Sequence, residues 1–215
     1  MHAPLRIRPL RRLAATLLCC LSATAWAGPD DDYKAGLKSY GNGDVITAMP
    51  LLKKAADAGH APAQALYGQI LGRADSDDEA VVYMKKAADQ GNPDGQFGYG
   101  SMLSGGEGIK RDPVAGRAWV TKAAEQGHKL AINELALAYI KGSPGLTDEM
   151  RRSETALRWI RVAADNDFIP AVDALAEAYR AGGLGLDADV RQAEQWSAKS
   201  RKLRGISGKR RGDKK

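Results

Sequence analysis

The sequence of 215 residues predicts an all-α protein, an α/α solenoid (superhelix) of about five helix-turn-helix repeats. A pair of small residues recurs near the end of a helical pattern, at 55–56, 87–88, 123–124 and 163–164, with a decayed copy at 200–201. A large apolar residue stands four positions before each pair, namely Leu51, Tyr83, Trp119, Trp159 and Trp196. A stripe with helical spacing precedes four of the pairs, at 63–71, 95–103, 131–139 and 171–179. Such units cannot bury their stripes alone, so they stack into a solenoid.

Residues 1–27 precede the repeats and have the order of an export signal. Four arginines and no acid stand before a weakly apolar run, 13–27, which ends in Ala25-Trp26-Ala27. We therefore expect a secretory signal peptide cleaved near Ala27, and a periplasmic or secreted mature protein. Cys19 and Cys20 would leave with this segment, so the mature chain would have no thiol. A short buried helix, a twin-arginine signal and a lipid-modified cysteine are the alternatives.

The first two units depart from the regular pattern. The first begins with the segment 33–44, and its second helix carries Pro50. Proline removes a backbone N–H and clashes with the preceding turn at a cost of about 3 kcal/mol, so we expect this helix to kink or to start late. The second unit is short because the polar residues 73–78 replace a Gly-rich link.

The later units show clearer helix boundaries. Asp112-Pro113 has the pattern of an N-cap followed by the first residue of a helix, and Gly127 suits a left-handed C-cap. Small residues at 68, 100, 136 and 176 would let the paired helices approach closely. The fourth unit is long through residues 143–149, which we interpret as a plain structural insertion rather than a specificity loop.

The formal net charge of +6 is unevenly distributed. Nine of the 32 basic residues lie in the last 17 positions, and the repeat body is acidic. We predict a signal peptide at 1–27, a repeat solenoid at 30–204 and a basic disordered tail at 205–215. The basic end could contact an anionic envelope surface or an acidic partner, or could screen the acidic repeat body. It could also be a solvated terminus whose first turns finish the last helix. An export signal conflicts with nucleic-acid binding, so we expect no nucleic-acid partner.

One unit carries a specific family resemblance. Residues 95–103, the link Gly106-Glu107-Gly108-Ile109, Asp112 and the helix 119–127 together resemble one complete Sel-one-like repeat (SLR), a tetratricopeptide-like repeat with a longer loop. The similarity covers about 30–204 and indicates an exported bacterial member of that family. It implies an α/α superhelix that binds proteins and scaffolds complexes, and it supplies no catalytic residues.

Residues for catalysis, metal binding or cofactor binding are scarce. His60 and His128 each follow a repeat-ending glycine, so we expect them to cap or pack beside the next helix. Glu134 and Glu177 occupy related first-helix positions and could form an acid–base pair only in a cleft that separates their pKa values. The tryptophans are expected in the core. We therefore predict no catalytic residue, no metal site and no cofactor.

The function that the sequence favours is an exported protein–protein interaction scaffold or adaptor of the cell envelope. We expect a protein or peptide partner on the concave face, where first helices line up. The candidate partner-binding residues, all expected to be exposed, are Gln64, Gln69, Gln96, Asn133 and Glu177. The alternatives are a hydrolase of β-lactams or cell-wall glycans, which the resemblance suggests only for cysteine-rich relatives, and an envelope structural protein held by its basic tail. The partner's identity and the oligomeric state stay open.

Overall fold

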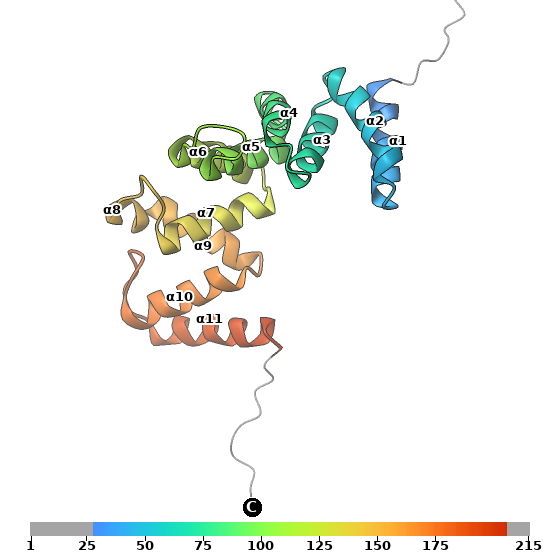
Figure 1. The fold of residues 1–215 in the computed structure, drawn as a ribbon. Coiled ribbons are helices and arrows are strands. Elements are labelled where there is room, and N and C mark those ends of the chain that lie inside the picture. The colour runs from blue at the N-terminus through green and yellow to red at the C-terminus, as the bar shows by residue number, and fades with distance from the viewer. Residues whose placement is uncertain (1–27, 206–215) are drawn as a thin grey trace, which may run out of the picture.

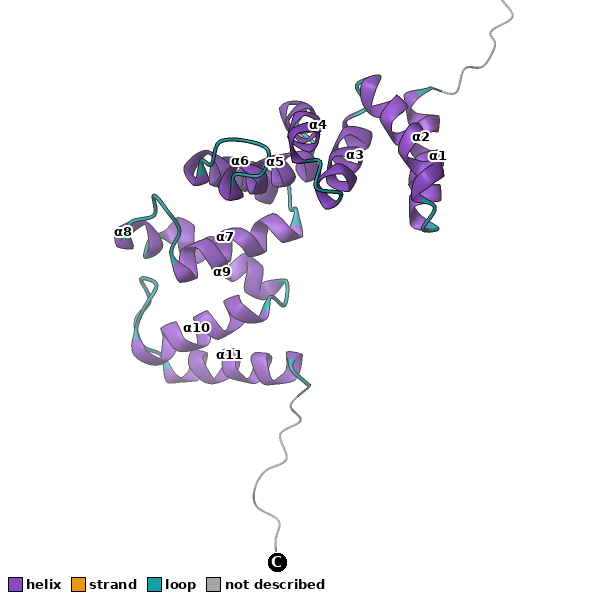
Figure 2. Cartoon of the chain, in the orientation of Figure 1, coloured by secondary structure: helices purple, strands orange, loops and turns teal. Residues whose placement is uncertain are grey.

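The computed structural model describes residues 28–205, which form eleven helices (Figure 1). The helices are α1 (Pro29–Gly41), α2 (Val45–Asp57), α3 (Ala61–Arg73), α4 (Asp77–Asp89), α5 (Pro93–Gly105), α6 (Pro113–Glu125), α7 (Lys129–Lys141), α8 (Asp148–Arg151), α9 (Glu154–Asp165), α10 (Ile169–Ala181) and α11 (Val190–Leu203). Within the described range these helices are joined by loops, with one isolated bridge between Gly183 and Leu186 (Figure 2). The predicted all-α class is confirmed.

Ten of these helices form five antiparallel pairs that stack in chain order. The pairs are α1 with α2, α3 with α4, α5 with α6, α7 with α9, and α10 with α11. The stack follows a curved path, and α3 and α5 lie toward its inner side (Figure 1). The predicted solenoid of five pairs is therefore confirmed. Helix α8 was not predicted and lies in the insertion of the fourth unit.

Side-chain caps define most helix starts. A cap oxygen or ring nitrogen accepts a hydrogen bond from the amide three residues later at Asp44, His60, Asn92, Asp112, His128, Thr147, Ser153 and Asp189. This bond satisfies one of the amides that the first helical turn leaves without a partner. The second helices of the first three pairs are followed by Gly59, Gly91 and Gly127, each with a positive φ.

The start of α2 corrects one prediction. Helix α2 begins at Val45 and contains Pro50, so of the two expected outcomes the late start is wrong, and the kink stays a prediction. The carboxylate of Asp44 accepts from the Thr47 amide at 3.0 Å, and this cap fixes the start upstream of the proline. Pro50 itself is exposed, so its ring lies outside the core.

The core consists of two clusters of buried side chains. One joins the first three pairs and includes Leu52, Tyr67 and Met84, and the other joins the last three and includes Leu135 and Ile160. The expected packing role of the tryptophans is supported, since Trp159 is 5% exposed and Trp119 and Trp196 pack partly buried against the clusters. Basic side chains lie on their rings, as Lys122 does 3.8 Å above Trp119.

The insertion of the fourth unit packs against its own solenoid. Arg117 on α6 donates from Nη1 to the Pro144 carbonyl at 2.8 Å. Arg151 on α8 donates from Nε to the Tyr139 carbonyl at 3.0 Å and from Nη2 to the Ile140 carbonyl at 2.7 Å. The two bonds from Arg151 satisfy carbonyls in the last turn of α7, and the Arg117 bond ties the insertion to α6, which favours the structural interpretation of the insertion.

No helix within residues 28–205 combines the length and apolar character needed to cross a bilayer.

Candidate interaction surface

A groove of about 490 Å³ crosses the first helices of four successive pairs. Its lining comes mainly from α1, α3, α5 and α7, the first helices of their pairs. The residues that line it are Tyr33, Leu37, Pro62, Ala65, Leu66, Gly68, Gln69, Gly72, Arg73, Met84, Asp94, Phe97, Gly98, Ser101, Met102, Glu107, His128 and Leu130. We call this surface the inner groove.

Small residues open the floor of the inner groove. Gly68 and Gly98 have no side chain, so Met84 of α4 forms the floor between them. A Cβ at Gly98 would lie 2.5 Å from the Met84 sulfur and would cover it. Large apolar side chains surround this floor. Leu37 on α1 is 43% exposed and Leu130 on α7 is 59% exposed, although both line the groove. An exposed apolar surface inside a groove is typical of a docking site.

His60 lies where α3 meets α1, and His128 lies where α7 meets α5. The His128 Nδ1 accepts from the Ala131 amide at 3.1 Å, and its Nε2 lies 3.1 Å from Asp94 of α5. Because Nδ1 accepts, the neutral ring carries its proton on Nε2 and donates it to the carboxylate. His60 caps α3 in the same way at 3.2 Å. The predicted capping role of both histidines is confirmed.

Aromatic rings complete the same two junctions. The centroid of the His128 ring lies 4.7 Å from that of Phe97, and the centroid of the His60 ring lies 4.6 Å from that of Tyr33. Asn92, at the equivalent position between these two histidines, caps α5 with its side-chain oxygen at 2.8 Å from the Gly95 amide. The ring contact therefore distinguishes the two histidine junctions from the asparagine junction.

Two carboxylates and one guanidinium stand at the edges of the inner groove. Within the described residues, the Asp94 carboxylate accepts a hydrogen bond from the neutral His128 ring and forms no ion pair with a lysine or arginine, and Glu107 forms no ion pair. The guanidinium of Arg73 donates to the Tyr40 hydroxyl at 2.9 Å. Among residues 28–205, the groove therefore offers two carboxylates without a lysine or arginine partner, one at the start of α5 and one just after its end.

The five candidate partner-binding residues separate into different environments. Gln69 is exposed and lines the inner groove, Asn133 is half-buried, and Glu177 is exposed and paired with Arg180. Gln64 and Gln96 are only 4% and 6% exposed, so the expectation that they are exposed is wrong. Of the five, only Gln69 lies in the groove lining.

Gln64 and Gln96 lie buried against other helices: Gln64 bonds to α2 of the preceding pair, and Gln96 bonds to the end of α6 within its own pair. Gln64 donates from Nε2 to the Ala56 carbonyl at 2.9 Å and accepts from Gln90 at 2.6 Å. Gln96 accepts from Gln126 at 2.7 Å. These bonds satisfy polar groups that would otherwise be buried without a partner.

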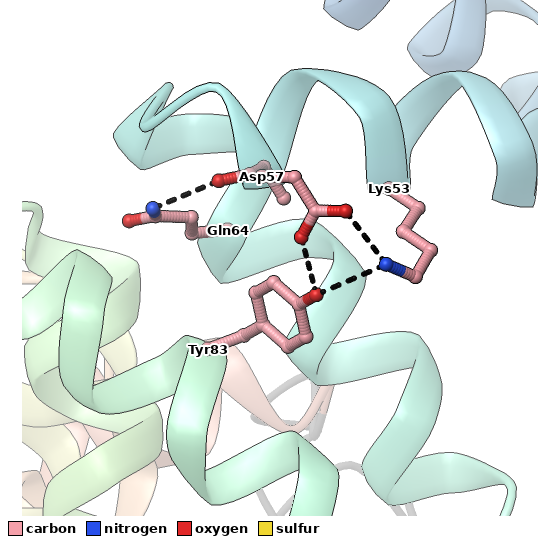
Figure 3. Close-up of polar contacts among 5 residues, drawn as sticks. Lys53, Asp57, Gln64 and Tyr83 are labelled. Carbon is pink, nitrogen blue, oxygen red and sulfur yellow. Dashed lines mark hydrogen bonds and ion pairs between the residues drawn. The ribbon is translucent and has the colours of Figure 1, made fainter.

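A polar cluster beside Gln64 joins the first two pairs (Figure 3). The Tyr83 hydroxyl donates to Asp57 Oδ1 at 2.6 Å, and Lys53 Nζ donates to Asp57 Oδ2 at 2.6 Å. Hydrogen bonds from Lys53 and Tyr83 lower the pKa of the Asp57 carboxyl below its usual value. Burial, then the bond to Asp57, raises the pKa of Tyr83. The cluster fastens α2 to α4, and each member has a structural partner.

Glu134 and Glu177 do not form the common acid–base pair considered from the sequence. Glu134 lines a separate cavity of about 330 Å³ among α5, α6 and α7, whose lining excludes Glu177. Burial raises the pKa of Glu134, and a hydrogen bond from Ser101 partly offsets this effect. The carboxylate of Glu177 is held by Arg180 instead. Residues 28–205 also bring together no group of three or more potential metal ligands.

Sequence reasoning missed the apolar residues of the inner groove, including Tyr33, Leu37, Phe97 and Leu130. Each stands on a first helix but outside the apolar stripe that predicted the core. A large apolar residue on the polar side of an amphipathic helix was the available signal.

Comparison with known proteins places the repeats in a family. The Sel1 repeat model matches residues 33–60, 61–92, 93–128, 129–168 and 170–203. A Sel1 repeat protein from Oxalobacter formigenes has a similar structure, with a TM-score of 0.63 and 26% identity over 81% of this chain and 71% of that one. No curated protein matches the chain significantly.

Two further solved structures, each less than 25% identical, support the fold alone. A protective antigen of uropathogenic Escherichia coli strains, which displays an SLR fold, has a TM-score of 0.67 and 24% identity. The match covers 82% of this chain but only 38% of the length of that antigen. A Sel1 repeat protein from Klebsiella pneumoniae subsp. pneumoniae has a TM-score of 0.54 and 20% identity over 83% of this chain and 88% of that one.

Proposed function

The chain belongs to the Sel1 repeat family, and we propose on this basis that it is an exported scaffold or adaptor of the cell envelope that binds a protein or peptide in the inner groove. Sel1 repeat proteins typically serve as protein–protein interaction scaffolds and are generally non-enzymatic. The observation that carries the proposal is the inner groove itself, which crosses four first helices and exposes Leu37 and Leu130.

The physical support comes from the way a solenoid binds. Its first helices present a rigid surface that is formed before the partner arrives, so binding does not require the protein to fold first. Glycine and alanine on the floor leave space, and the methionines beneath it can adjust to different side chains. These features suit a partner segment with large apolar residues.

The proposed export depends on residues 1–27, which lie outside the described residues. Their basic, apolar and small residues in sequence support a cleaved signal. Mass determination of the protein recovered from a periplasmic extract tests this part. A mature amino terminus at residue 28 would support export, and an intact chain confined to the cytoplasm would contradict it.

Affinity capture from an envelope extract tests the binding site. Gln69→Trp fills the inner groove from an exposed position on α3. Gln195→Trp makes the same change at an exposed position on α11, in a helix pair that contributes no residue to the groove. A partner recovered with wild type and Gln195→Trp but not with Gln69→Trp supports the proposal. Equal recovery with both variants contradicts it, as would turnover of a β-lactam or glycan in the absence of a partner.

The alternative of an envelope structural protein rests on the basic end of the chain. Its described part finishes α11, as expected for the first turns: Lys199 pairs with Asp167 at 3.0 Å, and Arg204 pairs with Asp173 at 2.5 Å. The remaining basic residues, after 205, lie outside the described residues. Truncation after Gly205 therefore removes them without cutting these ion pairs. Loss of envelope association in that truncation alone would favour the tail over the groove.

A further inference from the structure

We propose that the occupant of the inner groove is a basic amphipathic α-helix of the partner, with an apolar stripe on the floor and lysine or arginine residues along both flanks. This inference rests on the proposed function, because it names the chemistry of the segment bound at the same site. Three properties of the groove carry it: its length, its width between carboxylates and its charge.

The length of the apolar surface matches a helix of several turns. Leu37 lies on α1 and Leu130 on α7, and the two helices between them are α3 and α5. Helices that pack side by side are spaced about 8–10 Å apart, and α1 reaches α3 mainly through α2, as α5 reaches α7 mainly through α6. The three spacings therefore span at least about 24–30 Å. A partner helix rises 1.5 Å per residue and needs at least about 16–20 residues to cover that distance. Its apolar residues at helical spacing would contact each first helix in turn.

The width of the groove matches the diameter of a helix. Asp94 is the second residue of α5 and Glu107 follows its last residue, Gly105, so the two carboxylates stand at opposite ends of this helix. A helix of 13 residues is about 18–20 Å long. A partner helix that crosses α5 has a diameter of about 10–12 Å and leaves about 3–5 Å on each side. That space suits a charged hydrogen bond from a flanking lysine or arginine to each carboxylate.

An extended strand fits this geometry less well. Its side chains point alternately to opposite faces, and neighbouring backbones in a sheet are only about 4.8 Å apart. A single strand on the floor would therefore leave about 7 Å to each carboxylate, and half of its side chains would point away from the groove. A helix presents an apolar stripe and two charged flanks at the same time.

The charge of the lining favours a basic partner. Asp94 and Glu107 have no lysine or arginine partner among the described residues, and the side chain of Asp94 is 72% exposed. Arg73 is the one guanidinium in the lining, and its bond to the neutral Tyr40 hydroxyl leaves its positive charge in place, so the lining carries two carboxylates against one cation. An acidic helix would face two carboxylates at close range, whereas a basic helix would pair with both.

Selection from a displayed library of random 20-residue peptides tests the inference on residues 28–215. Peptides are selected on wild type and counter-selected on Gln69→Trp, so that only groove-dependent peptides remain. We expect these peptides to carry apolar residues at i, i+3, i+4 and i+7 with lysine or arginine beside them. Groove-dependent peptides that are acidic or lack this spacing overturn the inference and leave the proposed function standing. If no peptide distinguishes wild type from Gln69→Trp, both fail.

The affinity of the best groove-dependent peptide tests the two carboxylates. Asp94→Asn and Glu107→Gln should each raise its Kd about three- to fivefold, and the effect should disappear in 1 M salt, where charges beyond about 3 Å are screened. Glu154→Gln, an exposed carboxylate on α9 outside the groove, is the matched control and should leave the Kd unchanged. A peptide whose proline substitution abolishes helix formation should also lose binding. Unchanged Kd values in Asp94→Asn and Glu107→Gln would overturn the proposed charge pairing.

Discussion

Substituting Gly116 by alanine tests how closely α5 and α6 approach. A Cβ at this position would lie 2.5 Å from the Gly100 carbonyl oxygen and 2.3 Å from the Ser104 hydroxyl oxygen. The hydroxyl can rotate away, but the carbonyl belongs to the backbone of α5. The two helices would have to separate by most of an ångström to restore an ordinary contact.

The expected result is a loss of stability, although helix propensity alone predicts a gain. Overpacking costs about 1–3 kcal/mol, and replacing glycine by alanine inside a helix returns about 1 kcal/mol. We therefore expect Gly116→Ala to lower the free energy of unfolding by up to about 2 kcal/mol. Equivalent positions in the other pairs hold Ala48, Ala80, Ala156 and Ala193, so a consensus argument predicts the opposite sign.

Urea unfolding followed by far-ultraviolet circular dichroism measures the change. Gly72→Ala is the matched control, because its Cβ would meet no atom closer than the Ala80 Cβ at 3.8 Å. We expect this control to be more stable than wild type by about 0.5–1 kcal/mol. If Gly116→Ala unfolds at the same urea concentration as wild type or a higher one, the close contact between α5 and α6 does not govern stability here.

Three further predictions concern titration and capping. Burial raises the pKa of Glu134, so the folded state binds the Glu134 proton more tightly than the unfolded state. The free energy of unfolding therefore falls as pH rises from about 4.5 through the raised pKa. Glu134→Gln should flatten that dependence in urea unfolding from pH 4 to 7. Hydrogen bonds from Arg204 and Ser200 lower the pKa of Asp173, so its contribution is present above about pH 4 and lost as pH falls through the lowered value. An acid titration followed by circular dichroism should show a weaker dependence in Asp173→Asn, and an identical titration would contradict this. His128→Asn should keep the cap, as Asn92 does, whereas His128→Ala should cost about 1 kcal/mol, read as a drop of about 2–4 °C in Tm.

The helix pairs could be predicted because their signals are local. Residues three and four apart lie on one helix face, so the stripe 131–139 indicates its own buried side. Asp112 and Gly127 mark a start and an end through bonds to neighbours a few residues away. The local signal of Pro50 led to a wrong prediction of where α2 starts, because the Asp44 cap begins the helix at Val45, upstream of the proline.

The exposure of polar residues could not be predicted in the same way. Gln64 and Gln69 are five residues apart on α3, yet Gln64 is buried against Ala56 and Gln90, while Gln69 faces the inner groove. The difference depends on Ala56 of the preceding pair and on Gln90 at the end of α4, the partner helix of α3. Helix α8 was missed because Thr147 caps a helix of only four residues within a loop.

The sequence by itself determined the helix pairs, their order and their membership of one repeat family, because periodicity, caps and small residues act within a single unit. Only the tertiary structure decided where the binding surface lies. Leu37, Phe97 and Leu130 come from three different units, and each one alone is an ordinary exposed or half-buried side chain. Stacking places them beside a floor opened by Gly68 and Gly98, and the inner groove exists because side chains more than 30 residues apart in the sequence share it.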